Sequence, residues 1–175
     1  AIFHDLYVKK ANGRYAQIDL VVATKVGLIV FEVKDYSGWI FGRGNQDKWT
    51  QVLAYGRDKY RFYNPIKQNA GHIAELQKQS KQMSEIPMFS VVVFYGGCTL
   101  RDVSIIPHNT YVTTWRRALD VVDTILEENV PANYTDKHEI VRILKAAVEN
   151  GTKENIAEQH ADEVQDMLGQ DRVFD

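Results

Sequence analysis

The sequence predicts an α/β protein with a mixed central sheet and flanking helices. Three apolar segments near the N-terminus, residues 5–10, 14–24 and 28–34, are separated by short turns, which is typical of a strand meander. Residues 88–95 (MFSVVVFY) form a continuous apolar run, typical of a central strand buried on both faces. Segments with helical periodicity follow these strands, so the expected order of elements is hairpin strands, helix, buried strand, strand and helix.

The first three strands are expected to form an antiparallel meander. Asn12-Gly13 predicts a type I′ turn between the segments Asp5–Lys10 and Arg14–Thr24. Only Lys25-Val26-Gly27 separates the second segment from the third, which is short enough to force another antiparallel hairpin.

The middle of the chain predicts short strands and one long helix. Glycines punctuate two β segments, Trp39–Phe41 and Trp49–Leu53, which we expect to form a smaller extension of the sheet. Asn64 is a good N-cap and Pro65 suits the first helical position, so a helix is expected to run to about Met83. Its expected buried stripe consists of Ile66, Ala70 and Ile73.

After the buried strand, Tyr111–Thr113 predicts one more strand, and a helix capped by Thr114 is expected to follow. That helix carries Leu119, Val122, Ile125 and Leu126 on its apolar face.

The C-terminal part predicts a helical extension. Thr135 is expected to cap a helix that ends at about Asn150 and Gly151, and Thr152 to start a thinly apolar, acidic helix reaching Leu168. We therefore divide the chain into a domain of residues 1–130 and an extension of residues 131–175. The extension is a candidate surface for a protein partner or a homodimer.

Composition limits the possible classes of protein. The 175 residues, 45% hydrophobic and 25% charged, suffice for one well-formed core. The net charge of −2 gives no global positive field, so any contact with nucleic acid must be local. Cys98 is the single cysteine, and no apolar stretch is long enough to span a bilayer. These features predict a cytoplasmic protein with no membrane segment in this fragment.

Polar residues interrupt two apolar strands at matching positions. If Thr24 pairs with Gly27, the numbers of paired residues sum to 51, and Asp19 then lies opposite Glu32. In the same register Gln17 lies opposite Lys34. If Gly27 were instead a bulged residue, the sum would be 52 and the patch would not form.

Two carboxylates facing each other across a ladder are destabilising without a partner. A divalent cation such as Mg²⁺ would resolve the conflict, because it prefers oxygen ligands. The alternative is an ordinary cross-strand ion-pair cluster of Asp19 and Glu32 with Lys34 and Lys25.

An aspartate followed by a Glu-X-Lys triplet after an apolar hairpin resembles the PD-(D/E)XK nuclease superfamily. The surrounding phrases resemble its nuclease-related domain, often called NERD, over roughly residues 4–115. They are His4-Asp5-Leu6 before an Asn-Gly turn, Gln17-Ile18-Asp19, Glu32-Val33-Lys34 followed by Gly38, Trp49, and Asn64-Pro65 with Gln68 and His72.

The resemblance implies a restriction-endonuclease-like core in which Asp19 and Glu32 bind Mg²⁺ or Mn²⁺. It further implies that Lys34 activates water or stabilises charge, and that Gln68 faces the metal centre. His72 is not expected to be a ligand, because hard cations prefer oxygen. The family usually begins with a helix bearing a further Glu, whereas this sequence opens at Ala1 almost directly on the first strand.

A basic and aromatic segment precedes the long helix. In extended form it places Arg57, Lys59 and Arg61 on one face and Tyr60 and Phe62 on the other. Basic side chains contact phosphates and aromatic rings can stack on unpaired bases, so the three cations are candidate nucleic-acid contacts. The alternative is that the rings pack beneath the sheet and the cations are solvated.

The sequence thus predicts a metal-dependent nuclease that hydrolyses phosphodiester bonds, with DNA as the expected substrate. Two other classes stay open: a nucleic-acid-binding module that retains the fold without cleaving, and a protein-interaction module that docks through residues 152–168.

Overall fold

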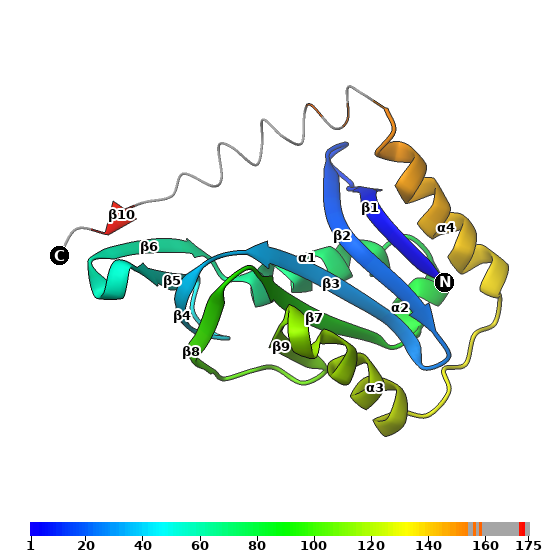
Figure 1. Cartoon of the computed structure of the whole chain (residues 1–175). Helices are drawn as coiled ribbons and strands as arrows, with labels where there is room; N and C mark the ends of the chain where they lie inside the picture. Colours follow the sequence, from blue (N-terminus) through cyan, green and yellow to red (C-terminus); the bar gives the residue numbers. More distant parts are fainter. Residues whose placement is uncertain (154–155, 157, 159–171, 174–175) are drawn as a thin grey trace.

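A computed structural model describes residues 1–153, 156, 158, 172 and 173, and shows the expected mixed α/β architecture (Figure 1). Two five-stranded sheets have the strand orders β1-β2-β3-β7-β9 and β10-β6-β5-β4-β8. The strands are β1 (Ile2–Lys9), β2 (Tyr15–Thr24), β3 (Gly27–Asp35), β4 (Gly38–Arg43), β5 (Lys48–Leu53), β6 (Asp58–Tyr63), β7 (Met88–Tyr95), β8 (Cys98–Ser104), β9 (Thr110–Thr114) and β10 (Arg172–Val173). The α-helices are α1 (Pro65–Gln77), α2 (Lys81–Glu85), α3 (Ala118–Glu128) and α4 (Lys137–Asn150).

The first sheet combines an antiparallel meander of β1, β2 and β3 with parallel pairing of β3, β7 and β9. Thr24 pairs with Gly27, so the register sum of 51 is confirmed. The predicted type I′ turn is wrong: Lys10 N–H bonds to Arg14 O, which leaves a three-residue loop. Its last residue, Gly13, takes the positive φ of 85°, while Asn12 does not, as in a type I turn followed by a bulged glycine.

Helices cover both faces of the first sheet. On one face, Leu76 of α1, Met83 of α2 and Leu144 of α4 share a buried cluster with apolar residues of β1, β2 and β3. On the other face, Ile125 of α3 packs with residues of β3 and β7. Every residue of β7 except Tyr95 is buried, which confirms the prediction of a central strand.

The short strands form a second sheet instead of extending the first, because β4 pairs with β5 and with the unpredicted strand β8. Ile40, Trp49 and Phe62 of this sheet pack against Ile66 of α1 and Phe94 of β7. The second sheet therefore lies at the carboxyl ends of β3 and β7 (Figure 1).

The boundaries of the predicted long helix differ from those observed, because an additional N-cap lies within the predicted range. Ser80 accepts a hydrogen bond from Met83 N–H and starts α2, so the long helix expected to Met83 is split. Ala70 is exposed, and Asn69 takes the buried place beside Ile66.

The helices after β9 also start differently. Thr114 makes no side-chain cap and precedes a 3₁₀ turn, Trp115–Arg117. Asp136 caps α4 in place of Thr135, because its carboxylate accepts the N–H groups of His138 and Glu139. Most of the helix predicted from Thr152 to Leu168 lies outside the described residues. No described helix has the length and apolar character needed to span a membrane.

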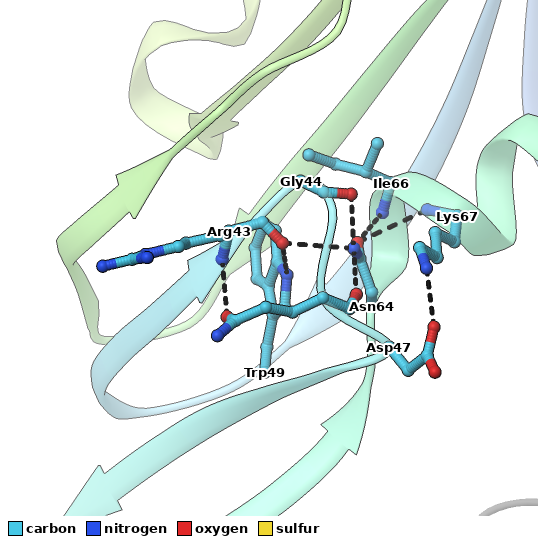
Figure 2. A network of polar contacts seen from close by, with 8 residues as sticks. Arg43, Gly44, Asp47, Trp49, Asn64, Ile66 and Lys67 are labelled. Atoms are coloured by element: carbon cyan, nitrogen blue, oxygen red, sulfur yellow. Dashed lines mark hydrogen bonds and ion pairs between the residues drawn. The ribbon is translucent and has the colours of Figure 1, made fainter.

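The fully buried Asn64 joins the two parts of the fold (Figure 2). Its Oδ1 accepts the N–H of Ile66 at 2.8 Å and caps α1. Its Nδ2 donates to the carbonyls of Gly44 at 3.0 Å and Gln46 at 2.7 Å, in the loop between β4 and β5. At the rim, Lys67 Nζ lies 2.6 Å from Asp47 Oδ1. One side chain thus fixes the start of α1 against the second sheet.

We expect Asn64→Ala to lower the free energy of unfolding by about 3 kcal/mol, because it removes an N-cap and leaves buried carbonyls without a donor. Thermal or urea unfolding measures the loss. Lys67→Ala is the matched control, since it removes only the exposed ion pair at the same helix start. Equal stability of Asn64→Ala and Lys67→Ala would contradict the role assigned to Asn64.

Candidate functional site

Five polar side chains converge where β2 and β3 separate beneath α1: Asp19 from β2, Glu32 and Lys34 from β3, and Gln68 and His72 from α1. The ladder between β2 and β3 ends at the pair Leu20 and Phe31. The predicted ladder pairs of Asp19 with Glu32 and of Gln17 with Lys34 are therefore not formed, although the register is the predicted one. Opposed carboxylates destabilise a ladder, which explains why the strands part here.

Asp19 replaces the missing ladder bond with its side chain, because its Oδ2 accepts the N–H of Val33 at 2.7 Å. Burial and the neighbouring Glu32 carboxylate raise the pKa of Asp19 above its ordinary value of 3.8, although the Val33 N–H, Lys34 and His72 act in the opposite direction. The charged form of the Asp19 carboxylate is therefore disfavoured in the protein alone.

Lys34 links the Glu32 carboxylate of its own strand to the helix α1. Its Nζ lies 3.2 Å from Glu32 Oε1 and donates a hydrogen bond to Gln68 Oε1 at 2.8 Å. Glu32 is only 4% exposed, so its charge depends on such contacts rather than on water. Gln68 thus holds the Lys34 ammonium group within the cluster.

The second oxygen of Glu32 has no hydrogen-bond partner. Glu32 Oε2 is buried and lies 3.3 Å from His72 Nδ1, which is itself buried without a hydrogen bond, and this contact is an ion pair only when His72 is protonated. An unpaired, buried carboxylate oxygen is costly, and it marks the place where a cation would be most stabilising.

Asn69 belongs to the same arrangement and was missed by the sequence analysis. It is fully buried, and its Nδ2 donates to Val30 O and Ser90 Oγ, both at 2.8 Å. These bonds tie α1 to β3 and β7, one turn away from His72. The available signal was an asparagine within the helix's apolar stripe, since a buried amide requires partners.

The three predicted nucleic-acid contacts do not lie together with these carboxylates. Lys59 and Arg61 point outward from β6, while Arg57 lies in the turn before that strand. Phe62 is buried and its ring stacks on Tyr36 at 4.5 Å, so for this ring the packing alternative is confirmed. Contact of the three cations with nucleic acid stays a prediction.

The donor set fits a hard divalent cation. Asp19 and Glu32 supply carboxylate oxygens, one of them unpaired and buried, and Mg²⁺ completes its coordination with water and substrate oxygens. Within the described residues, no three or more His, Cys, Asp or Glu side chains gather into a metal-binding group. The chemistry of the cluster is thus that of an open site with two carboxylates, rather than a closed protein cage.

A mixed sheet with an Asp and a Glu-X-Lys cluster at the end of a central strand defines a nuclease-like class of protein. The family described as "Nuclease-related domain" (NERD) matches residues 1–95, more than half of the chain, and the chain belongs to this family.

An uncharacterized protein of Bacillus anthracis is 34% identical over 104 residues, which cover 59% of this chain. The match covers 47% of that protein, so the chain spans about half the length of this relative. No solved structure matches the chain.

The raised pKa of Asp19 predicts how stability depends on pH. A carboxyl group whose folded pKa is raised binds its proton more tightly when folded, so the metal-free protein loses stability as pH rises from about 3.8 through the folded pKa. We expect Asp19→Asn to stabilise the metal-free protein at pH 7 by roughly 0.2–1 kcal/mol, the range for cross-strand charge pairs. At pH 4 the difference should shrink.

Chemical denaturation in EDTA at the two pH values measures this difference. Asp123→Asn, on the exposed side of α3, is the control for a general change in net charge. A loss of stability in Asp19→Asn at pH 7 that persists at pH 4 would contradict the electrostatic account.

Proposed function

We propose that this protein is a metal-dependent nuclease that hydrolyses phosphodiester bonds, with DNA as its substrate. The observation that carries the proposal is the convergence of the half-buried Asp19 and Lys34 with the buried Glu32 in one cluster. Membership of a nuclease-related family supports it.

Asp19 and Glu32 would hold Mg²⁺ or Mn²⁺. When bound, such a cation lowers the pKa of a coordinated water and offsets the negative charge of the phosphate. The raised pKa of Asp19 and the buried Glu32 Oε2, which has no hydrogen-bond partner, support this assignment, because a bound cation would stabilise the charged form of both carboxylates.

Lys34 would act on the reacting group. Its ammonium group is held between Glu32 Oε1 and Gln68 Oε1, so its direction is fixed before substrate arrives. A preorganised cation at this point can orient the attacking water or stabilise the charge that develops on the phosphorane. Gln68 acts through Lys34 and is a positioning residue.

Arg57, Lys59 and Arg61 would contact phosphates away from the reacting group, which contributes affinity without sequence preference. The residues 131–175 would form a C-terminal extension that is available to a protein partner, although α4 shares the core of the first sheet.

A binding module without cleavage is the second candidate. The observation that favours it is the small donor set, since the described residues offer two carboxylates and no third acidic ligand. Titration of Mg²⁺ or Mn²⁺ with single-stranded and duplex DNA separates the two candidates: binding without any metal-dependent product would favour this one.

Metal binding is expected to stabilise the protein, because a cation that binds only the folded state raises the melting temperature by mass action. At a concentration of one hundred times Kd, the gain is about 2.7 kcal/mol, or roughly 5–11 °C for a domain of this size. Asp19→Ala should abolish the shift in thermal unfolding, whereas Asp123→Ala should retain it. An unchanged rise in melting temperature in Asp19→Ala would show that Asp19 does not bind the cation.

We expect one variant to lose cleavage and a second variant to lose DNA affinity. Lys34→Ala should lower cleavage by about 10²–10³-fold, the usual effect of losing one preorganised charge, and leave DNA affinity nearly unchanged. Arg61→Ala should mainly weaken binding and its salt dependence. Cleavage is measured in Mg²⁺ and binding in Ca²⁺. Equal cleavage by the wild type and Lys34→Ala would contradict the nuclease proposal.

A further inference from the structure

The outer face of the second sheet is the side turned away from Ile40, Trp49 and Phe62. Side chains alternate along a strand, so the register between strands shows which residues share this face. For example, Trp39 of β4 pairs with Val52 of β5, and Val52 pairs in turn with Lys59 of β6. The members of this face are Trp39, Phe41, Arg43, Lys48, Thr50, Val52, Lys59, Arg61, Tyr63, Thr99, Arg101 and Asp102.

Two aromatic rings of the outer face lie on β4, between β5 and β8. Trp39 and Phe41 are two residues apart on β4 and are half-buried. On the inner side of the sheet, by contrast, Trp49 and Phe62 are buried. Neighbouring same-face positions on a strand are about 6.8 Å apart. Each ring therefore presents its own surface, and Tyr63 adds a third, 41% exposed, on β6.

Positive charge surrounds these rings. The face carries Arg43, Lys48, Lys59, Arg61 and Arg101, whereas the acidic side chain that β4, β5, β6 and β8 place there is Asp102. The Arg101 guanidinium lies 4.7 Å from the centroid of the Trp39 ring. In Figure 2 the Arg43 side chain points away from the Asn64 network. Because the whole chain has a net charge of −2, this is a local concentration of positive charge.

We propose that the outer face of the second sheet binds single-stranded DNA. The choice of DNA as the nucleic acid rests on the proposed function. Rings stack on bases and the surrounding cations pair with phosphates, the combination that single strands require. In a duplex the faces of the bases are already covered by their neighbours, so exposed rings on a sheet would gain little. The charge complementarity favours a polyanion over an apolar protein partner.

The connection to the carboxylate cluster is short and fixed. Trp39 lies five positions after Lys34 in the chain, a span of at most about 18 Å. Tyr36 N–H bonds to Tyr95 O at 3.2 Å, and Gln51 Nε2 donates to Ser37 O at 2.9 Å. Gly38 takes a φ of 78° where any Cβ would collide with Val52 O. A strand held on the outer face is thus kept at a constant distance from Lys34.

The experiment measures the affinity for a labelled single-stranded DNA of mixed sequence by fluorescence anisotropy in EDTA. The same measurement with duplex DNA and with single-stranded RNA of the same sequence gives the comparison. Trp39→Leu and Phe41→Leu keep apolar volume but remove the aromatic rings. We expect each to weaken single-strand binding about tenfold or more. Arg61→Ala should lower the slope of log K against log salt by about 0.7. Single-stranded DNA should also quench tryptophan fluorescence in the wild type and much less in Trp39→Leu.

Trp115→Leu and Arg142→Ala are the matched controls, because they remove an exposed ring and an exposed cation from other surfaces. Equal losses in the controls, tighter binding of duplex or of RNA, or unchanged affinity in both Trp39→Leu and Phe41→Leu would overturn the proposal. Circular dichroism and thermal unfolding show whether each variant is folded, and Arg61→Ala tests the same face without a core change.

The outcome is separable from the nuclease proposal, because binding is measured without metal. Single-strand binding that depends on Trp39, without any cleavage in Mg²⁺ or Mn²⁺, would support the outer face and contradict the nuclease. Cleavage that needs Lys34, with binding unaffected by both Trp39→Leu and Phe41→Leu, would do the reverse.

Discussion

The buried Glu32 carboxylate is the constraint on which the arrangement of the site depends. A charge that is only 4% exposed must be matched within the protein, and Lys34 and His72 approach its two oxygens from β3 and α1. That requirement fixes where α1 must lie over β3. It also explains why the ladder of β2 and β3 ends one pair before Asp19, since a second carboxylate in strict opposition would add repulsion to the cost of burial.

Two asparagines hold α1 in that position by different contacts. Asn64 joins the helix start to the loop between β4 and β5, and Asn69 joins its second turn to β3 and β7. Buried amides with specific partners have few alternative positions, whereas an apolar helix face can slide. The polar contacts therefore determine the placement of Gln68, while apolar packing supplies the bulk of the stability.

Local patterns allowed much of the first sheet and the polar cluster to be predicted. The short connection after Thr24 predicted the hairpin and limited its register to two possibilities, of which the pairing of Thr24 with Gly27 is the observed one. The apolar run of β7 predicted its central place. The second sheet could not be predicted in the same way, because β4 pairs with β8 across some sixty residues of chain and β8 is itself poorly apolar. Local caps also shifted boundaries: Ser80 starts a new helix where one continuous helix was predicted, and Asp136 caps α4 in place of Thr135.

The same long-range pairing explains why the aromatic rings beside the basic residues of β6 could not be identified from the sequence of that segment alone. Within β6, the rings of Tyr60 and Phe62 alternate with the cations, so they point to the opposite face, and Phe62 is buried. Besides Tyr63 on β6 itself, the rings that share the face of Lys59 and Arg61 are Trp39 and Phe41 on β4, two strands away. A single sequence shows which residues alternate within a strand, but only the register between strands shows which residues meet. In this fold, the surface chemistry is therefore a property of the sheet rather than of any one segment.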